Sequence, residues 1–250
     1  MPTKSIVPRE DGEGGLGTSQ KRWGEIFVKK ASLGTNTTAS GENAVAEGRD
    51  TTASGQASHA EGEGTTASEP YSHAEGIETT AQGTASHAEG IRSIAYLFTQ
   101  HAKASGAFPP DDEPGGAQYS NVCVRNITTN DFPTELFING LDTRITFPDQ
   151  NRAWNFRIRV IASQSGGISG AVGDTAGWRI NGVIKIVNGT VSFVGDPKIE
   201  ILGLDTGAGN WTVGIIADNT NKALVVKVRG EANKTIRWVG FVELVEVKFA

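Results

Sequence analysis

The sequence has very little cysteine: Cys123 is the only one among 250 residues, so no disulfide can form within the chain. Its neighbours Val122 and Val124 predict a strand with a buried thiol, and we do not expect that thiol to be a catalytic nucleophile. No apolar run reaches about 18 residues, and residues 1–10 lack the pattern of a signal peptide. We therefore expect no membrane insertion and no export through a signal peptide.

Positive charge is also scarce. The chain has 23 Lys and Arg against 28 Asp and Glu, a net charge of −5, and its basic residues form no cluster, so we expect no nucleic-acid binding. The glycine-rich residues 11–17 lack the strand and helix that flank a phosphate-binding loop. The sequence shows neither a Gly-x-Ser-x-Gly elbow nor a carboxylate pair in a glycosidase context. These observations predict a protein that is not an enzyme and needs no cofactor.

What the chain does contain is a 14-residue period. Its four histidines are His59, His73, His87 and His101, each 14 residues after the one before. Aligned on them, residues 34–103 divide into five copies without insertion or deletion. The copies share a glycine column (Gly34, Gly48, Gly62, Gly76, Gly90) and two alanine columns (Ala39, Ala53, Ala67, Ala81, Ala95 and Ala46, Ala60, Ala74, Ala88, Ala102). A fixed period of this kind indicates a solenoid.

The size of the repeat decides which kind of solenoid it is. Fourteen residues are too few for two helices, so each coil is predicted to hold two short strands, of about 4 to 5 residues, stacked in parallel. Because side chains alternate along a strand, Ala60 points away from His59 and Glu61. The alanines are expected inside the coil, with histidine and glutamate outside. Such a thin coil buries too little apolar surface to stand alone, which predicts assembly with other copies.

The pentapeptide Ser-His-Ala-Glu-Gly occurs at residues 58–62, 72–76 and 86–90. The repeat resembles those of trimeric autotransporter adhesin heads, and the pentapeptide is similar to repeats in bacteriophage tail fibres and appendages. The resemblance implies a left-handed parallel β-roll, packed three to a rod with the columns equivalent to His and Glu facing the axis. The implied trimer-axis ladder consists of His59, Glu61, His73, Glu75, His87, Glu89 and His101. A ladder that faces solvent is the alternative.

The histidines also raise the question of a metal site. Three copies of one histidine around a threefold axis would offer three nitrogen ligands, which zinc accepts. A structural ladder explains all four histidines at once, because Glu61, Glu75 and Glu89 follow two residues later on the same face as hydrogen-bond partners. We therefore expect no metal.

The first 33 residues form a separate segment. Residues 1–18 are rich in glycine, proline and charge, and Trp23 is predicted to cap the first coil. The string Gly-Thr-Ser-Gln-Lys-Arg-Trp-Gly at residues 17–24 is similar to a segment that precedes the shaft regions of phage fibre proteins. That similarity implies attachment to other virion proteins through the N-terminus.

A turn-rich connector is predicted at residues 104–118, and strands and turns fill residues 119–250. Alternation is clear at residues 154–160, 183–186, 224–228 and 243–249. About nine or ten strands without a helix predict an antiparallel β-sandwich or jelly roll. The expected fold class is therefore all-β, with a β-roll of five coils followed by a sandwich, assembled as a homotrimer.

Tryptophan supplies the candidate binding residues of the second domain. Trp154, Trp211 and Trp238 open alternating strands and are expected in the core, whereas Trp178 follows a glycine-rich loop and is expected to be accessible. An accessible indole can stack on a sugar ring. The candidate receptor-binding residues are Trp178, Asp174 in the same loop, and Asp218, Asn219 and Asn221 in a polar turn.

These features predict a structural fibre or tail appendage of a phage virion, whose C-terminal domain binds a host-surface carbohydrate multivalently. One alternative is a purely structural head fibre or decoration protein with a trimerising C-terminal domain. The other is an enzyme that depolymerises a surface polysaccharide or cleaves its own chain.

Overall fold

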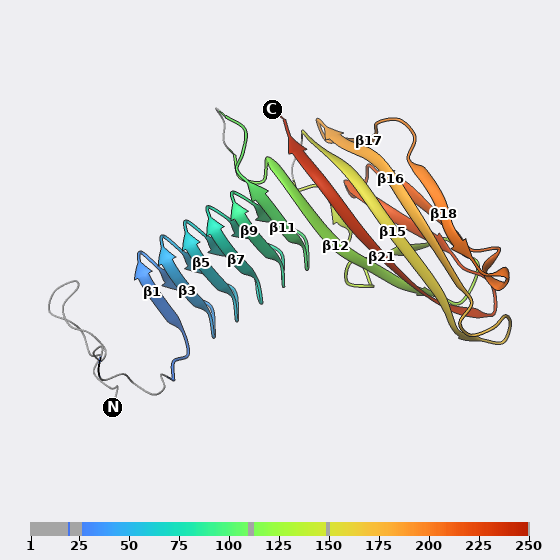
Figure 1. The fold of residues 1–250 in the computed structure, drawn as a ribbon, viewed down its shortest axis with the longest axis horizontal. Coiled ribbons are helices and arrows are strands. Elements are labelled where there is room, and N and C mark those ends of the chain that lie inside the picture. Colours follow the sequence, from blue (N-terminus) through green and yellow to red (C-terminus); the bar gives the residue numbers. More distant parts are fainter. Residues whose placement is uncertain (1–19, 21–26, 110–112, 149–150, 250) are drawn as a thin grey trace.

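The computed structural model describes residues 20, 27–109, 113–148 and 151–249 (Figure 1). The predicted cap at Trp23 and most of the predicted N-terminal attachment segment lie outside the described residues. Over the described ranges the only helix is a three-residue 3₁₀ turn, η1 (Thr206–Ala208), and no helix there is long and apolar enough to cross a membrane. The all-β prediction is confirmed.

The first half of the chain is a parallel β-solenoid, as predicted. One sheet of the roll stacks six five-residue strands: β1 (Ala31–Thr35), β3 (Val45–Arg49), β5 (His59–Glu63), β7 (His73–Ile77), β9 (His87–Ile91) and β11 (His101–Ser105). The other stacks five two-residue strands: β2 (Thr38–Ala39), β4 (Thr52–Ala53), β6 (Thr66–Ala67), β8 (Thr80–Ala81) and β10 (Ile94–Ala95). Each residue pairs with the one 14 positions later, for example His59 with His73. The period therefore sets the register directly.

The interior of the roll is made of alanine. Both alanine columns are fully buried from the second copy onward, and together with Ala44 they form a hydrophobic cluster that is separate from the rest of the protein. Serine and threonine flank the alanines inside, and the hydroxyl of Ser58 donates to the carbonyl of Gly55. Since methyl groups are nearly all that this interior buries, the roll gains little hydrophobic stabilisation from its own chain.

The glycine column marks a close approach between coils. Gly48, Gly62 and Gly76 have φ of 108–109°, a conformation that residues with a side chain rarely adopt. A Cβ atom on any of them would collide with the carbonyl oxygen of the glycine one coil further on. Glycine is therefore required in this column by both backbone conformation and space.

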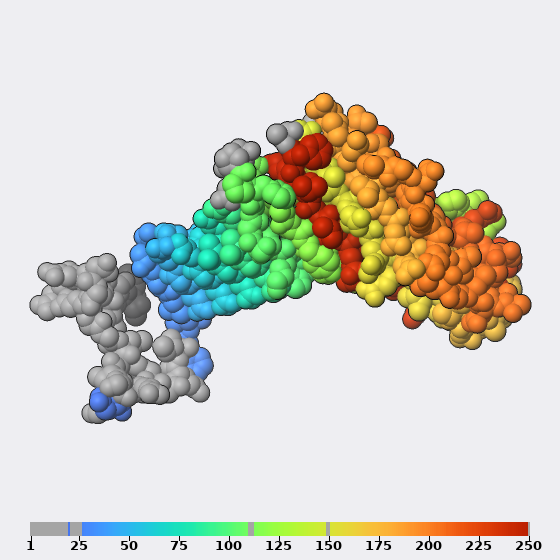
Figure 2. Space-filling view, turned by 45° about the horizontal axis from the view of Figure 1, so that its top comes forward, coloured from blue at the N-terminus to red at the C-terminus, as the bar shows by residue number. Residues whose placement is uncertain are grey.

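The roll passes without a break into the C-terminal domain. Strand β11 pairs in antiparallel fashion with β12 (Ala117–Thr128), matching Lys103 to Tyr119. The same sheet continues through β21 (Lys234–Lys248), β15 (Arg152–Gly167), β16 (Thr175–Val187), β17 (Thr190–Phe193) and β18 (Lys198–Leu204). Figure 2 shows the two halves in direct contact along this seam. The molecule thus has one twelve-stranded sheet that spans both domains.

A smaller antiparallel sheet covers the inner face of the C-terminal part. It contains β13 (Thr134–Leu136), β14 (Ile145–Thr146), β19 (Thr212–Asp218) and β20 (Ala223–Arg229). Side chains of both sheets share one core, in which Trp154, Trp211 and Trp238 are buried as predicted. Ten strands between residues 117 and 248 agree with the nine or ten expected.

Two predictions about single side chains are wrong. Cys123 is exposed, because its neighbours Val122 and Val124 point into the core and alternation places the thiol on the opposite face. Trp178 is only 2% exposed, because it pairs with the buried Val160 on the inner face and stacks on Trp238 with ring centroids 5.6 Å apart. It therefore cannot stack on a sugar in this conformation.

A buried carboxylate joins the last coil to the C-terminal domain. Glu246 on β21 accepts hydrogen bonds from Tyr96 Oη of the fifth coil at 2.5 Å and from Trp154 Nε1 at 3.1 Å. It also accepts from Ser120 and Gln118 of β12 and pairs with Arg152 at 3.4 Å. Burial and the negative charge of Glu246 raise the pKa of Tyr96 well above its usual value, so its hydroxyl stays a donor. No local pattern in the sequence predicts this network.

Candidate functional site

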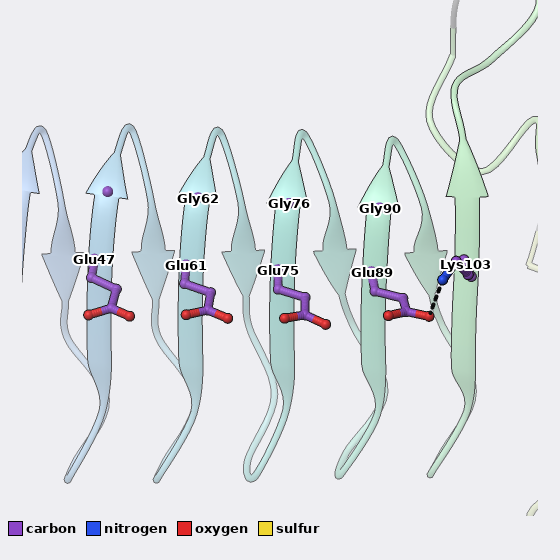
Figure 3. A pocket seen from close by; sticks show the side chains of 9 residues that line it. Glu47, Glu61, Gly62, Glu75, Gly76, Glu89, Gly90 and Lys103 are labelled. Atoms are coloured by element: carbon purple, nitrogen blue, oxygen red, sulfur yellow. Dashed lines mark ion pairs between the residues drawn. The ribbon is translucent and has the colours of Figure 1, made fainter.

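The outer face of the roll's larger sheet carries the histidines and glutamates as two parallel columns. The rings of His59, His73, His87 and His101 are stacked, with successive centroids 4.6–4.8 Å apart and planes within 8° of parallel. The glutamates project from the same face of successive strands, as Figure 3 shows. We call this surface, formed by the four histidines with Glu47, Glu61, Glu75, Glu89 and Lys103, the ladder face. The prediction that these side chains point outward is confirmed.

Each histidine lies beside the glutamate of the preceding coil. The distance from His Nε2 to Glu Oε1 is 3.6 Å for His59 and Glu47, 3.7 Å for His73 and Glu61, 3.2 Å for His87 and Glu75, and 3.4 Å for His101 and Glu89. These side chains keep between 24% and 45% of their surface exposed. The face is therefore polar and more than half covered, and of these four pairs the one between His87 and Glu75 is a hydrogen bond.

Sequence reasoning missed two members of this face, Glu47 and Lys103. Glu47 stands one period before Glu61, and Lys103 replaces glutamate one period after Glu89 and pairs with it at 3.2 Å. The same 14-residue spacing that revealed the other members would have found both. With them the face extends over five adjacent strands, β3 to β11.

Burial and neighbouring charges shift the pKa values of several side chains on the ladder face. Burial, followed by hydrogen bonds with Glu47 and Glu75, raises the pKa of Glu61. At the end of the column burial would raise the pKa of Glu89, but the hydrogen bond and charge of Lys103 outweigh it, and the pKa is lowered. Burial, and then the charges of His87 and His59, lower the pKa of His73. A neutral imidazole is therefore the favoured state at the centre of the stack.

The glutamate column lines an open groove of about 620 Å³, whose floor is the glycine column and whose end is Lys103. Its walls carry carboxylates at the spacing of neighbouring strands, because each coil contributes one. This arrangement repeats a single chemical group and does not bring together an acid and a base of different pKa. It is therefore suited to contact with a partner along the groove rather than to acid–base catalysis.

Metal ligation by two neighbouring histidines of one chain fits this geometry poorly. Among the described residues, three groups of side chains come within reach of a common ion: His73, Glu75 and His87; His87, Glu89 and His101; and Glu47, His59 and Glu61. Parallel rings stacked 4.6–4.8 Å apart, however, hold equivalent nitrogens at about that separation. Two nitrogens bound to one zinc ion at about 2.1 Å each cannot be more than about 4.2 Å apart. Neighbouring histidines would have to leave the stack to share an ion.

The candidate receptor-binding residues do not form one site. Asp174 precedes β16, where its carboxylate accepts from the backbone of Ala171, whereas Asn219 bonds the backbone of Val191 just beyond the far end of the same strand. The 13 residues of β16 separate these points by about 40 Å. Asp218 and Asn221 bond each other within their turn, and these bonds lower the pKa of Asp218.

The lowered pKa of His73 predicts a dependence of stability on pH. Its neutral form is favoured by folding, so this contribution is present above the unfolded pKa of about 6.5 and is lost as the pH falls through the folded value. We expect the urea midpoint to fall between pH 8 and pH 5.5, and His73→Gln to weaken that dependence. Urea titrations at several pH values measure both, and an unchanged pH dependence in the variant would contradict the assignment.

Comparison with known proteins places the repeats in a family. The model of the YadA head domain repeat matches residues 32–50, 46–68 and 74–96. No curated protein matches the chain. The resemblance to adhesin-head repeats expected from the sequence is confirmed.

Solved structures similar to the chain include three phage tailspikes. They are tailspike gp49 of Acinetobacter baumannii bacteriophage Fri1, a capsular polysaccharide depolymerase (9% identity, TM-score 0.33), and the tailspikes of Acinetobacter phage vB_ApiP_P1 and of Acinetobacter baumannii phage AM24 (each 10% identity, TM-score 0.28). The matches cover 85%, 88% and 88% of this chain but only 44%, 49% and 50% of those chains. The chain thus spans about half the length of these structures.

The expectation that the chain is not an enzyme is contradicted by these comparisons, since one of the similar structures is a capsular polysaccharide depolymerase. That expectation rested on missing local motifs. The two carboxylates of a glycosidase can come from strands far apart in sequence, so the lack of a motif does not exclude them. What the family comparison does show concerns the roll, which is similar to YadA head domain repeats over residues 32–68 and 74–96.

Proposed function

We propose that this chain is a subunit of a homotrimeric fibre on a phage virion, and that its C-terminal domain engages polysaccharide on the host surface. The observation that carries this proposal is the match of the roll to YadA head domain repeats, together with the similarity of its Ser-His-Ala-Glu-Gly pentapeptide to repeats in phage fibres. The continuous sheet supports it, because a stiff connection between roll and C-terminal domain suits a fibre that presents a binding domain.

The trimer is supported by the thinness of the roll. Its interior buries mainly alanine, so most of the apolar surface that would balance backbone entropy is missing from a single chain. The ladder face can supply an interface because two of its four glutamates already have partners within the chain, Glu75 with His87 and Glu89 with Lys103. Three copies facing a common axis would cover the half-exposed histidines and glutamates. The N-terminal attachment to other virion proteins remains a prediction.

The end of the C-terminal domain farthest from the roll is suited to host contact. The loop after β12 exposes Phe132 to 70%, and the loop between β15 and β16 exposes Ile168 to 91% and Val172 to 74%. Asp174, a predicted binding residue, closes the second loop. An exposed aromatic side chain such as Phe132 can stack on a sugar ring, and a carboxylate such as that of Asp174 can accept hydrogen bonds from hydroxyls, so Phe132 takes the role that was predicted for Trp178.

Binding of the full chain to an array of bacterial surface polysaccharides tests the proposal. We expect retention on at least one polysaccharide, and Phe132→Ala should weaken it by at least about tenfold, because three sites act together. Val194→Ala, at an exposed apolar residue near the other end of the domain, is the matched control and should bind normally. Release of reducing ends in the same samples reports degradation. A chain that neither binds nor degrades any host polysaccharide would favour the purely structural alternative.

A further inference from the structure

The outward face of the large sheet in the C-terminal domain gathers basic side chains that lie far apart in the sequence. Because burial alternates along β12, β21, β15 and β16, every second side chain of these strands points away from the core. We call this outward surface the arginine face. Its basic members are Arg125, Arg157, Arg159, Arg179, Lys185 and Arg237, and the one acidic side chain on the same side of these described strands is Glu243. A chain with a net charge of −5 thus concentrates positive charge on one surface.

The strand register brings several of these charges close together. Arg159 of β15 lies directly opposite Arg179 of β16, and like charges in such a pair destabilise a sheet. Each of the two has an acidic partner, since Arg159 pairs with Glu243 at 3.5 Å and Arg179 pairs with Glu200 of β18. These two acidic side chains are therefore already engaged within the chain.

The other arginines of the arginine face have no carboxylate partner among the described residues. Arg157 and Arg237 are exposed and form no ion pair with any acidic side chain that the structure describes. Arg125 donates instead to the backbone oxygens of Ile138 and Asn139. The register places Arg157 and Arg237 six residues and one strand apart, which is about 20 Å. A ligand that neutralises both must be a polymer.

We propose that the arginine face binds an acidic polysaccharide of the host surface. The inference rests on the proposed function and adds to it a chemical class of ligand and a second surface, apart from the loop of Phe132. A guanidinium donates two parallel hydrogen bonds to a carboxylate, so Arg157 and Arg237 can each hold one acidic sugar. Asn155 and Asn181 share the outward side with Arg157, where their amides can donate to and accept from hydroxyl groups.

A polysaccharide fits this surface better than a nucleic acid. Duplex DNA carries one negative charge per about 1.7 Å, and the net negative charge of the chain opposes so dense a polyanion. A polysaccharide with one acidic sugar in each repeating unit has neutral rings between its charges. The arginine face matches that pattern, because the exposed Ile161 and Val239 separate Arg237 from the other arginines.

The arginine face is expected to stay open when the ladder face closes a trimer. Arginines of three copies that lack carboxylate partners would repel one another at a shared axis. Figure 1 shows β12, β21 and β15 inclined to the strands of the roll, as the twist of a sheet requires, so their outward side turns away from the ladder face.

Binding of the full chain to the array of bacterial surface polysaccharides tests the inference, with each acidic polysaccharide presented both intact and after reduction of its carboxyl groups to alcohols. We expect R157Q/R237Q to bind an intact acidic polysaccharide at least about tenfold more weakly than wild type. Carboxyl reduction should weaken wild-type binding by a similar factor. The matched control K29Q/K30Q removes the same charge at exposed residues before β1 and should bind normally.

The outcomes separate this inference from the proposed function. If R157Q/R237Q binds as wild type does while Phe132→Ala binds weakly, the arginine face is not a site and the proposed function stands. If carboxyl reduction leaves binding unchanged, the assigned class of ligand is wrong. A chain that binds no polysaccharide would overturn both proposals. Duplex DNA that binds as tightly as the polysaccharide, and is lost in R157Q/R237Q, would show that the face holds any polyanion and would overturn its assignment to a polysaccharide.

Discussion

Replacing Glu246 by alanine is expected to lower the free energy of unfolding by about 3–5 kcal/mol, because it leaves a buried guanidinium without its carboxylate. The side chains of Glu246 and Arg152 are 0% and 3% exposed. Tyr96, Trp154 and Ser120 would lose their acceptor in the same step. Urea unfolding of wild type and variant under identical conditions measures the difference.

The control for this prediction is Glu200→Ala, which removes an ion pair with Arg179 whose members are 53% and 45% exposed. We expect a loss of no more than about 1 kcal/mol, because solvent already screens such a pair. A Glu246 variant as stable as this control would show that the network does not hold the roll to the C-terminal domain.

Replacing Gly62 by valine is expected to disrupt the roll, at a cost of about 3 kcal/mol or more. Gly62 has φ of 108°, and a Cβ atom there would collide with the carbonyl oxygen of Gly76 on the next coil. Because that oxygen belongs to the backbone, relief requires neighbouring coils to separate. Thermal unfolding followed by circular dichroism measures the effect.

A matched glycine two residues later gives the control. Gly64 has φ of 64°, and the equivalent position in the first copy is Asn36, with φ of 55°. The contact that a Cβ atom would make there is with the flexible side chain of Glu78. Gly64→Asn should therefore be tolerated or slightly stabilising, since it restricts the unfolded chain. Equal damage from both substitutions would mean that the glycine column is not specially constrained.

The roll could be predicted from sequence because its structure is local and repeated. The period placed both alanine columns inside, every histidine outside and every strand in register, and the structure agrees. The roll has one strand more than expected, β1, which begins at Ala31 and in which Ser32 takes the position of Ala46 in the register. This strand was not predicted because residues 31–33 deviate from the repeat consensus.

The C-terminal domain was predicted in type but not in arrangement. Its ten strands follow from alternation, yet the pairing of β12 and β15 with β21 joins residues more than 65 positions apart, which no local pattern reveals. The face of each strand depends on that pairing, so Cys123 and Trp178 were assigned to the wrong side. The same long separations conceal the Glu246 network.

The central claim is that the ladder face closes a trimer, and the mass of the full chain in solution tests it most directly. Light scattering on the chromatographic peak at neutral pH should give three times the mass of one chain. His73→Arg, which places a permanent charge at the centre of the ladder, should reduce that mass. A stable monomer for the unmodified protein would contradict the trimer, and with it the assignment of the ladder face to a shared axis.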